Sequence, residues 1–557
     1  MATPASPPPK PPHKNLNVIL ISTFVAFGGF LFGYDTGLIS GILEMDTFQA
    51  QFSTGTNENL TTSEKSLVVS MLSVGTFIGA IVSGWAADRF GRKWAMIWST
   101  VVFAVGVAIQ TGCSTVPVLT FGRVIAGLGV GLLSDLVPLY HSEVAPKEIR
   151  YVFRKSTRSF QMSCPSITTQ QMSRQFLSGS LVATYQLTIT IGLLLAFVVN
   201  QITQGLTNSA AYRIPIGLQL LWALVLGGGC YFCPDSPRGL MREGRNEEAV
   251  AALRILYGVK DGDTYGEERV QEEISEIKAG LLHESQILTS TSYSTLWKQP
   301  LLRRTLIGIN LQMFQQLTGI NFIMYYGTTF FKSAGLEGFM TQTITGVVMV
   351  LFTLPGMWMI DKWGRRILMI IGCGVMFLGM MVVGVMGEAL PITKDAAGNV
   401  VSSSPTAGII ITVFSCVFIA GFAAAWGPGA WVVPSEIFPL PVRAKGISMA
   451  TASNWLWNFI LGFITPYLTD DQYAALGTKI AFVWAVCTFV GAGYVYFFVP
   501  ETKGLMLEDV DEMFESGVSA RQSVGWRKTR RDFGVEGGMV DDMDVVHKFE
   551  MEKPHVV

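Results

Sequence analysis

The sequence GWAADRFGRK at residues 84–93 returns in related form as GMWMIDKWGRR at residues 356–366. Two more pairs of motifs recur in the same order along the chain. These are SEVAPKEIR and SEIFPLPVRAKG, which start at Ser142 and Ser435, and PDSPRG and PETKG, which start at Pro234 and Pro500. Three motif pairs in one order indicate that the chain consists of two repeated halves, each built in the same way.

Long apolar runs dominate the composition. The chain has 557 residues, of which 50% are hydrophobic and 15% are charged, whereas soluble domains are about 25% charged. Twelve runs have about 20 residues each, the length of a membrane-spanning helix. They lie near residues 17–42, 67–87, 95–112, 117–140, 179–201, 212–233, 305–331, 341–360, 367–387, 408–433, 446–468 and 480–499. We therefore predict an all-α membrane protein with twelve transmembrane helices in two pseudo-symmetric six-helix bundles.

The runs divide the chain into five parts. They are a disordered cytosolic tail at 1–16, an N-terminal bundle at 17–235, an intracellular helical segment at 236–300, a C-terminal bundle at 301–500 and a cytosolic tail at 501–557. Residues 236–300 contain charged stretches such as EEAVAALRILYG, which predict short amphipathic helices. No cleavable signal peptide is recognised.

Lys and Arg residues gather in the loops after the second, fourth, sixth, eighth and tenth runs. Because positively charged loops remain on the cytosolic side, we predict cytosolic termini and a multi-pass protein of the plasma membrane. The sequon Asn59-Leu60-Thr61 then lies outside, where it permits glycosylation. The net charge is −1 and the basic residues share no single face, so the expected surroundings are the lipid bilayer and no nucleic acid.

One stretch interrupts the repeat. Residues 151–178 are rich in Ser, Thr, Gln and Arg and separate Arg150 from the next apolar run, whereas Gly446 follows Arg443 after two residues in the second half. One interpretation is a cytosolic insertion loop, because long loops cost little entropy. The other is a translated intron, since the ends of the stretch can be encoded by splice-like sequences in the same phase.

Two charged residues stand alone within apolar runs of the first half. Asp35 lies in GGFLFGYDTGLISG at residues 28–41, and Arg123 lies early in the fourth run, in FGRVIAGLGVG. A carboxylate at membrane depth costs about 3 kcal/mol or more unless it is paired or protonated. We predict that Asp35 alternates between pairing with Arg123 and taking up a proton, and that this exchange makes a proton-coupling site.

In combination, the motifs DRFGRK, GRVIAGLGVG, PDSPRGL, QQLTGIN, DKWGRR, PSEIFP and PETKG resemble those of the sugar porters of the major facilitator superfamily, most closely fungal monosaccharide transporters. The resemblance covers about residues 17–505, apart from the insertion. It implies transport of a monosaccharide, such as the hexose glucose, by alternating access. In proton symporters of this type, the acid at the position of Asp35 binds the proton and the arginine at the position of Arg123 is its partner. Some fungal facilitators also retain the acid, and a static ion pair is the structural alternative.

The resemblance also assigns a sugar site. Amide side chains donate to and accept from vicinal hydroxyls, and an indole can cover the C–H face of a sugar. The matching sugar-binding positions are Gln186, Gln315, Gln316, Asn321, Trp431 and Asn458, and Tyr325 and Tyr326 match the extracellular gate. Hydrogen bonding between helices explains any single one of these amides equally well, but it explains the complete set less well.

Two positions depart from the family pattern. Met349 stands where sugar porters usually carry a sugar-binding Asn, and Ala423 stands where animal facilitators carry a Glu. A thioether donates no hydrogen bond, so the loss of one contact is expected to cost about tenfold in affinity. The preference for glucose therefore stays open.

The repeated loop motifs place charges of both signs at helix ends. By resemblance they form a cytosolic latch that holds the bundles together when the cavity opens outward. Its members are Asp88, Arg89, Arg92, Glu143 and Arg150 in the first half, and Asp361, Arg365, Arg366, Glu436 and Arg443 in the second. The alternative is that the basic residues only fix the membrane topology, which does not explain the acids.

No nucleotide-binding loop and no cluster of His or Cys is present in the sequence. We therefore predict that the protein is not an enzyme and needs no metal or other cofactor. The expected partners are a sugar and a proton, and no obligate protein partner is evident. The alternatives are a porter-like sugar sensor, and a porter for quinate, a polyol or a pentose.

Overall fold

The computed structural model describes residues 16–54, 60–144, 176–287, 292–389, 393–394, 400–402, 405–439, 442–470, 472–505 and 507–526. Asn59 and Arg150 lie outside this part of the chain, as do all residues of the predicted insertion before Phe176. Most of the two predicted tails also lies outside it, because residues 1–15 and 527–557 are not described.

The helices of the first half follow the predicted apolar runs. They are α1 (Leu16–Val25), α2 (Phe27–Ile42), α3 (Asp46–Phe52), α4 (Thr62–Phe90), α5 (Arg92–Gly112), α6 (Val116–Val144), α8 (Phe176–Thr203) and α9 (Ala210–Phe232). A turn at Ala26 separates α1 from α2 within the first run. Helix α8 begins at Phe176, so the last three residues of the predicted insertion, 176–178, are helical.

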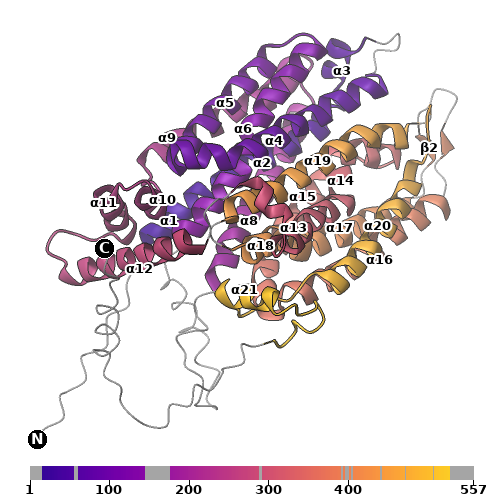
Figure 1. Cartoon of the computed structure of the whole chain (residues 1–557). Helices are drawn as coiled ribbons and strands as arrows, with labels where there is room; N and C mark the ends of the chain where they lie inside the picture. Colours follow the sequence, from indigo (N-terminus) through magenta and orange to yellow (C-terminus); the bar gives the residue numbers. More distant parts are fainter. Residues whose placement is uncertain are drawn as a thin grey trace, which may run out of the picture.

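The second half repeats this order with two interrupted spans. Its helices are α13 (Leu301–Leu317), α14 (Ile320–Ser333), α15 (Gly338–Trp363), α16 (Arg365–Ala389), α17 (Pro405–Gly421), the π-helix η3 (Phe422–Trp426), α18 (Gly427–Ile437), α19 (Arg443–Thr469), the 3₁₀ turn η5 (Gly477–Lys479) and α20 (Ile480–Phe498). A short antiparallel pair, β1 (Thr393–Lys394) and β2 (Val400–Ser402), lies between α16 and α17. Figure 1 shows the two halves as neighbouring groups of long helices.

Between the halves lie the predicted amphipathic helices, α10 (Pro237–Arg242), α11 (Asn246–Tyr257) and α12 (Thr264–Ile287), and then a 3₁₀ turn, η2 (Tyr293–Trp297). In α11 the buried residues are Ala249, Ala252, Leu253 and Leu256, the spacing of one helix face. They form a small core of their own with residues of α10 and α12. These three helices lie together at one end of the molecule (Figure 1).

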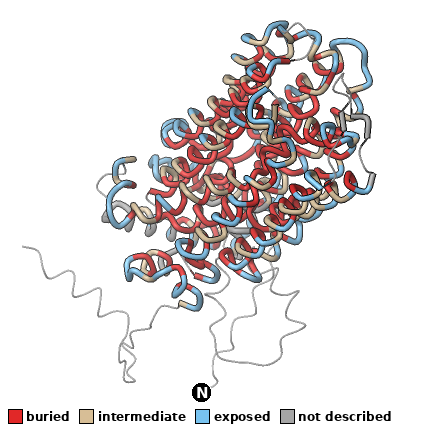
Figure 2. The backbone as a smooth tube through the Cα atoms, turned by 90° about the vertical axis from the view of Figure 1, so that its right-hand side faces the viewer, coloured by how far each residue is buried: buried red, intermediate tan, exposed pale blue. Residues whose placement is uncertain are grey.

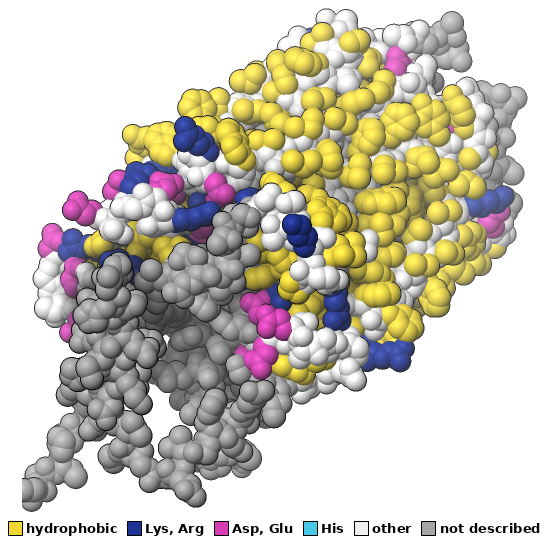
Figure 3. All heavy atoms as spheres, viewed as in Figure 1, with side chains coloured by type: hydrophobic (Ala, Val, Ile, Leu, Met, Phe, Trp, Pro, Cys, Tyr) yellow, Lys and Arg dark blue, Asp and Glu magenta, His cyan; other side chains and the backbone are white. Residues whose placement is uncertain are grey.

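The outer surface is that of a membrane protein. Buried residues fill the interior of the helix assembly (Figure 2), while the exposed flanks are covered by apolar side chains and the charged ones gather towards one end (Figure 3). Phe232, Leu224 and Phe489 are 85%, 73% and 68% exposed. Because such apolar surface is unfavourable in water, it is expected to face lipid. We call the end that carries Asp88, Arg92 and the helices α10–α12 the charged face.

Ten helices in the described part of the chain are long and apolar enough to cross a membrane. The remaining two of the twelve predicted spans are the broken pair α13–α14 and the more polar α19. The described helices are therefore consistent with twelve spans.

The break between α13 and α14 lies inside a run that the sequence predicted as one helix. Gly319 has a φ of +86°, and a Cβ atom built there would lie 2.4 Å from the ring of Trp484. Both the left-handed backbone and the close approach of the ring require glycine. The break directs the amides on either side of it towards the interior.

The chain after the last span packs against the second half. Helix α21 (Leu507–Glu515) places Asp511 against the buried guanidinium of Arg304 at the start of α13, and Arg304 also donates to Ile437 O at the end of α18. The ring of Phe514 lies 4.6 Å from the Arg304 guanidinium carbon. This C-terminal segment therefore joins the ends of two helices that carry predicted sugar ligands.

Replacing Gly319 by Ala is expected to destabilise the fold by about 2 kcal/mol or more, because an L-residue is strained at this φ and its methyl meets Trp484. The matched control is Gly493→Ala in α20, where an added Cβ meets no atom within 4 Å. Thermal unfolding of the purified protein in detergent measures both. Equal melting temperatures for the two variants would contradict this account of the helix break.

Candidate functional site

Contacts between the halves close the face opposite the charged face. Ser40 of α2 and Thr328 of α14 share a hydrogen bond of 2.9 Å. Four residues further along each segment, the Lys332 ammonium lies 3.1 Å from the Glu44 carboxylate, which also accepts from Thr329 at 2.6 Å. Beside them, the Thr62 hydroxyl of α4 donates to Asp470 after α19.

Contacts between the halves also close the charged face. The Ser448 hydroxyl of α19 donates to Ala80 O of α4 at 2.7 Å, and Tyr293 of η2 donates to Ile81 O at 3.2 Å. Halfway along the same helix pair, Ser73 of α4 donates to Asn458 of α19 at 2.7 Å. The residues in the middle of the molecule are thus enclosed between two closed ends.

Buried amides from α13, α14 and α19 form one hydrogen-bonded network in this middle region. The Gln316 amide donates to Asn454 at 2.9 Å, and Asn321 donates to the carbonyl oxygen of Gln316. Asn454 in turn donates to Gln312 at 2.6 Å and to Gln315 at 2.7 Å. The structure therefore brings together three predicted ligands from both sides of the break at Gly319.

Two members of this network, Gln312 and Asn454, were not predicted from the sequence. Both are buried, at 1% and 2% exposure. The signal was available, because each is an amide within an apolar helix and lies one turn from a predicted ligand, Gln316 or Asn458. A buried amide is useful here because it both donates and accepts, as sugar hydroxyls do.

The predicted gate tyrosines are bonded to α19. Tyr325 donates to the Asn458 carbonyl oxygen at 2.9 Å, and that oxygen also accepts from Ser73 of the first half. Tyr326 donates to Gly462 O at 2.6 Å. Asn458 therefore links the gate residue Tyr325 to both halves.

The remaining predicted ligands lie near the π-helix. The Gln315 amide donates to Trp426 O at 3.1 Å and to Gly427 O at 3.2 Å, where the π-helix passes into α18. Gln186 of α8 lies beside Gly427, since a Cβ there would be 3.1 Å from its amide nitrogen.

Trp431 of α18 meets Tyr185 of α8 edge to face, with ring centroids 6.0 Å apart. Met349 of α15 is buried at 2% exposure and Ala423 lies in the π-helix. All six predicted ligands are buried side chains.

Asp35 and Arg123 are both buried, at 0% and 1% exposure. The charge of Arg123 acts on the Asp35 carboxylate, so the two groups lie within electrostatic reach of each other. The buried amide of Gln219 of α9 also faces Asp35, but neither carboxylate oxygen, nor Nε and Nη2 of Arg123, has a hydrogen bond of normal geometry among the described residues. The charges of both groups also act on the Tyr325 hydroxyl. Asp35 and Arg123 thus lie within electrostatic reach of each other and of the gate residue Tyr325, without a bond between the two charges.

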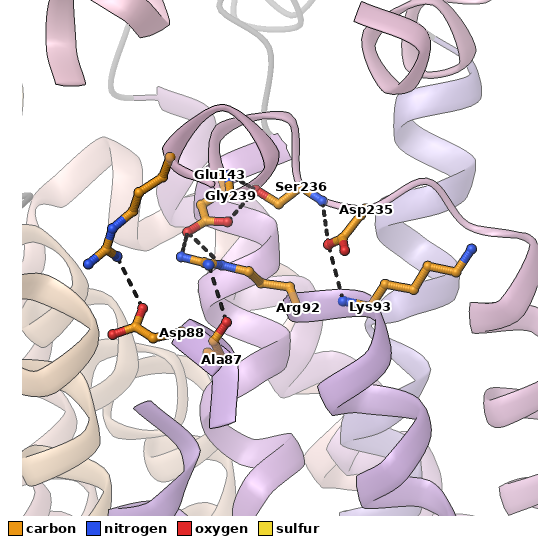
Figure 4. A network of polar contacts seen from close by, with 9 residues as sticks. Ala87, Asp88, Arg92, Lys93, Glu143, Asp235, Ser236 and Gly239 are labelled. Carbon is orange, nitrogen blue, oxygen red and sulfur yellow. Dashed lines mark hydrogen bonds and ion pairs between the residues drawn. The ribbon is translucent and has the colours of Figure 1, made fainter. Parts of the chain in front are cut away.

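A cluster of charges at the charged face joins three helix ends of the first half (Figure 4). Arg92 at the start of α5 donates to the Glu143 carboxylate of α6 at 2.7 and 3.1 Å and to Ala87 O of α4 at 3.3 Å. The Ser236 hydroxyl donates to the other oxygen of Glu143. Asp235 accepts from the backbone N–H of Lys93 at 3.2 Å.

Burial raises the pKa of the Asp235 carboxyl, and the backbone N–H groups of Ser236 and Lys93 oppose this rise. The carboxylate lies at the start of α5, where the helix dipole also favours a negative charge.

The second half repeats this cluster group by group. Arg365 donates to Glu436 at 2.8 and 3.2 Å and to Ile360 O at 3.3 Å. Thr502 donates to Glu436 at 2.6 Å, as Ser236 does to Glu143. Glu501 accepts from the backbone N–H groups of Arg365 and Arg366 at 3.0 and 3.1 Å, as Asp235 does from Lys93. The predicted repeat of the sequence is therefore also a repeat of contacts.

The other predicted latch residues lie around these clusters. Asp88 forms an ion pair of 3.1 Å with Arg242 of α10, and Asp361 lies 3.3 Å from Arg365. Arg366 donates to Tyr496 O at 2.6 Å and Arg443 to Phe438 O at 3.3 Å. Arg89 is exposed at the end of α4. The Arg92–Glu143 and Arg365–Glu436 pairs each join helices of one half, rather than joining one half to the other.

The chain matches the family model described as "Sugar (and other) transporter" in two pieces, residues 21–163 and 159–514. The chain belongs to this family of sugar porters in the major facilitator superfamily. The two pieces meet within the stretch that was predicted to be an insertion.

Relatives agree with this membership. The major facilitator-type transporter ecdD of Aspergillus rugulosus is 43% identical over 91% of this chain and 89% of its own. A probable glucose transporter of Neurospora crassa, rco-3, is 39% identical over 93% of this chain and 84% of its own. Among solved structures, the E. coli proton:xylose symporter XylE bound to 6-bromo-6-deoxy-D-glucose is similar, with a TM-score of 0.69 and 27% identity over 90% of this chain and 99% of XylE. The protein is thus a transporter of many membrane-spanning helices, as predicted, and not an enzyme.

Replacing Glu436 by Gln is expected to destabilise the second half by about 3 kcal/mol, because it removes the main partner of a buried guanidinium. The matched control is Glu248→Gln, since Glu248 pairs with Arg245 at the surface and its loss is expected to change stability little. Thermal unfolding in detergent compares the two variants. If Glu436→Gln melts at the temperature of the parent protein, the cluster does not hold the half together.

Proposed function

We propose that this porter moves a monosaccharide across the plasma membrane by alternating access, with a hexose such as glucose as the first candidate. The observation that carries the proposal is the buried amide network of Gln315, Gln316, Asn321 and Asn454, enclosed between two closed faces. Each amide exchanges donors and acceptors with its neighbours, so sugar hydroxyls can replace these bonds one for one. The glucose-transporter name of the relative from Neurospora crassa supports the choice of substrate.

We further propose that sugar movement is coupled to a proton at Asp35. An ionised carboxylate at membrane depth needs a cation, and Arg123 lies within electrostatic reach without being bonded to it. Because Tyr325 feels both charges and is bonded to Asn458, a change at Asp35 reaches the gate and the sugar site through one side chain. XylE, a structural neighbour of this chain, is described as a proton:xylose symporter, which supports the proposal.

For the cycle, we propose that residues 17–235 and 301–500 move as two bundles, with residues 236–300 between them. The charged face is assigned to the cytosol because its loops carry the Lys and Arg residues. Breaking the contacts of Ser448 and Tyr293 then opens the cytosolic side, and breaking those of Ser40 and Glu44 opens the outer side.

The variant Asp35→Asn is expected to lose uphill sugar accumulation while keeping exchange of labelled for unlabelled sugar, because Asn has the same shape but takes up no proton. The matched control is Asp46→Asn, an exposed acid at the start of α3. Uptake in cells that lack their own sugar transporters, with and without a protonophore, measures accumulation. Accumulation that survives in Asp35→Asn would contradict proton coupling at this residue.

The variant Gln316→Ala is expected to raise the KM for sugar about tenfold, since one hydrogen bond to substrate is worth about 1–2 kcal/mol. Gln110→Ala is the control, because Gln110 is an equally buried amide that bonds Gly122 O between α5 and α6 instead.

Equal effects of both substitutions on KM would mean that these amides serve helix packing alone. A panel of hexoses, pentoses, quinate and polyols in the same assay identifies the substrate. A sugar sensor would bind without uptake in every case.

A further inference from the structure

A second carboxylate is buried in the membrane region, and neither the sugar site nor the proposed proton site uses it. Asp135 lies on α6, twelve residues after Arg123, which places it about 18 Å further along the helix towards the charged face. Its exposure is 0%. At that separation Arg123 cannot form an ion pair with it.

The immediate surroundings of Asp135 offer one hydrogen bond. The Ser83 hydroxyl of α4 lies 2.5 Å from Oδ2, while Oδ1 has no hydrogen-bond partner. No ion pair between Asp135 and a cation is found among the described residues. An ionised carboxylate in such a place is strongly unfavourable, so the closed arrangement favours the neutral, protonated acid.

Other titratable groups face Asp135 from the neighbouring elements. Tyr185 of α8 and Tyr293 of η2 lie within its electrostatic reach, and both phenols are neutral at physiological pH. The ammonium of Lys445 of α19 lies 5.7 Å from the centre of the Tyr293 ring. His141, six residues along α6, is bonded to Ser22 O of α1 instead. None of these contacts supplies Asp135 with a bonded positive charge.

Asp135 lies where the two halves meet near the charged face. The neighbouring residue Ser134 accepts from the Trp455 indole of α19 at 3.3 Å. The Ser448 hydroxyl of α19 bonds to Ala80 O, and Ala80 O is also bonded by Ser83, the partner of Asp135. When the halves separate here, these bonds break and water can reach the carboxyl group, which lowers the cost of ionisation.

We propose that Asp135 is a second proton-binding site, which holds a proton while the halves are closed at the charged face and releases it when that face opens. The step breaks one carboxyl O–H bond and passes the proton to water on that side, with no other reactant. The proposal rests on the proposed transport function, but not on proton coupling at Asp35. It makes transport depend on the pH at the charged face.

The first test uses the full chain in sealed vesicles and measures exchange of labelled for unlabelled glucose without a gradient. The pH is varied only on the charged-face side. The parent protein is expected to show a pH-dependent exchange rate, and Asp135→Asn is expected to lose this dependence. Ser83→Ala is expected to shift the midpoint by about one pH unit, because it removes the hydrogen bond that Asp135 shares with Ser83. Identical pH profiles in the parent and Asp135→Asn would overturn the proposal.

The second test reads the proton directly and does not need transport. Infrared difference spectra of the purified protein between low and high pH are expected to contain a protonated-carboxyl band that Asp135→Asn removes and Asp35→Asn leaves in place. If Asp135→Asn does not fold, a shift of that band's midpoint in Ser83→Ala supports the proposal, and an unshifted midpoint overturns it. If no sugar is exchanged at all, the proposed transport function fails, while the infrared test still shows whether Asp135 binds a proton.

Discussion

Along α4 and α19, the two halves are joined by hydrogen bonds that side-chain hydroxyls donate from one helix to the other. The rest of the structure depends on these hydrogen bonds being weak. Ser66 bonds to Phe463 O near one end, Ser73 to Asn458 in the middle, and Ser448 to Ala80 O near the other. A polar group in a membrane needs a partner within the protein, and water can take over when a face opens. Each such bond is worth only about 1 kcal/mol net, so the join is reversible.

The contacts within each half are of another kind. Arg92 with Glu143, and Arg365 with Glu436, are buried charge pairs with two hydrogen bonds each. Removing one partner of such a pair leaves a buried charge, which costs several kcal/mol. Strong contacts inside a half and weak contacts between halves are the mechanical requirement for two bodies that move as units. The repeated motifs therefore do more to keep each half intact than to fasten the two together.

Much of this architecture could be predicted from the sequence, because the spans, the repeat and the buried amides each have a local signature. The break at Gly319 could not, since it lies inside an apolar run and depends on the distant ring of Trp484. The partners of the latch charges could not be predicted either, because a motif gives residue types and not their pairing. The role of Asp135 was not predicted, although its local pattern, a lone acid in the apolar run LLSDLVP, is the same as that of Asp35.

The C-terminal segment extends this picture beyond the membrane. Asp511 and Phe514 contact Arg304 of α13, and Arg304 in turn donates to Ile437 O at the end of α18. The segment therefore links the ends of α13 and α18. A protein bound to α21, or a covalent modification of it, would therefore act on the ends of α13 and α18.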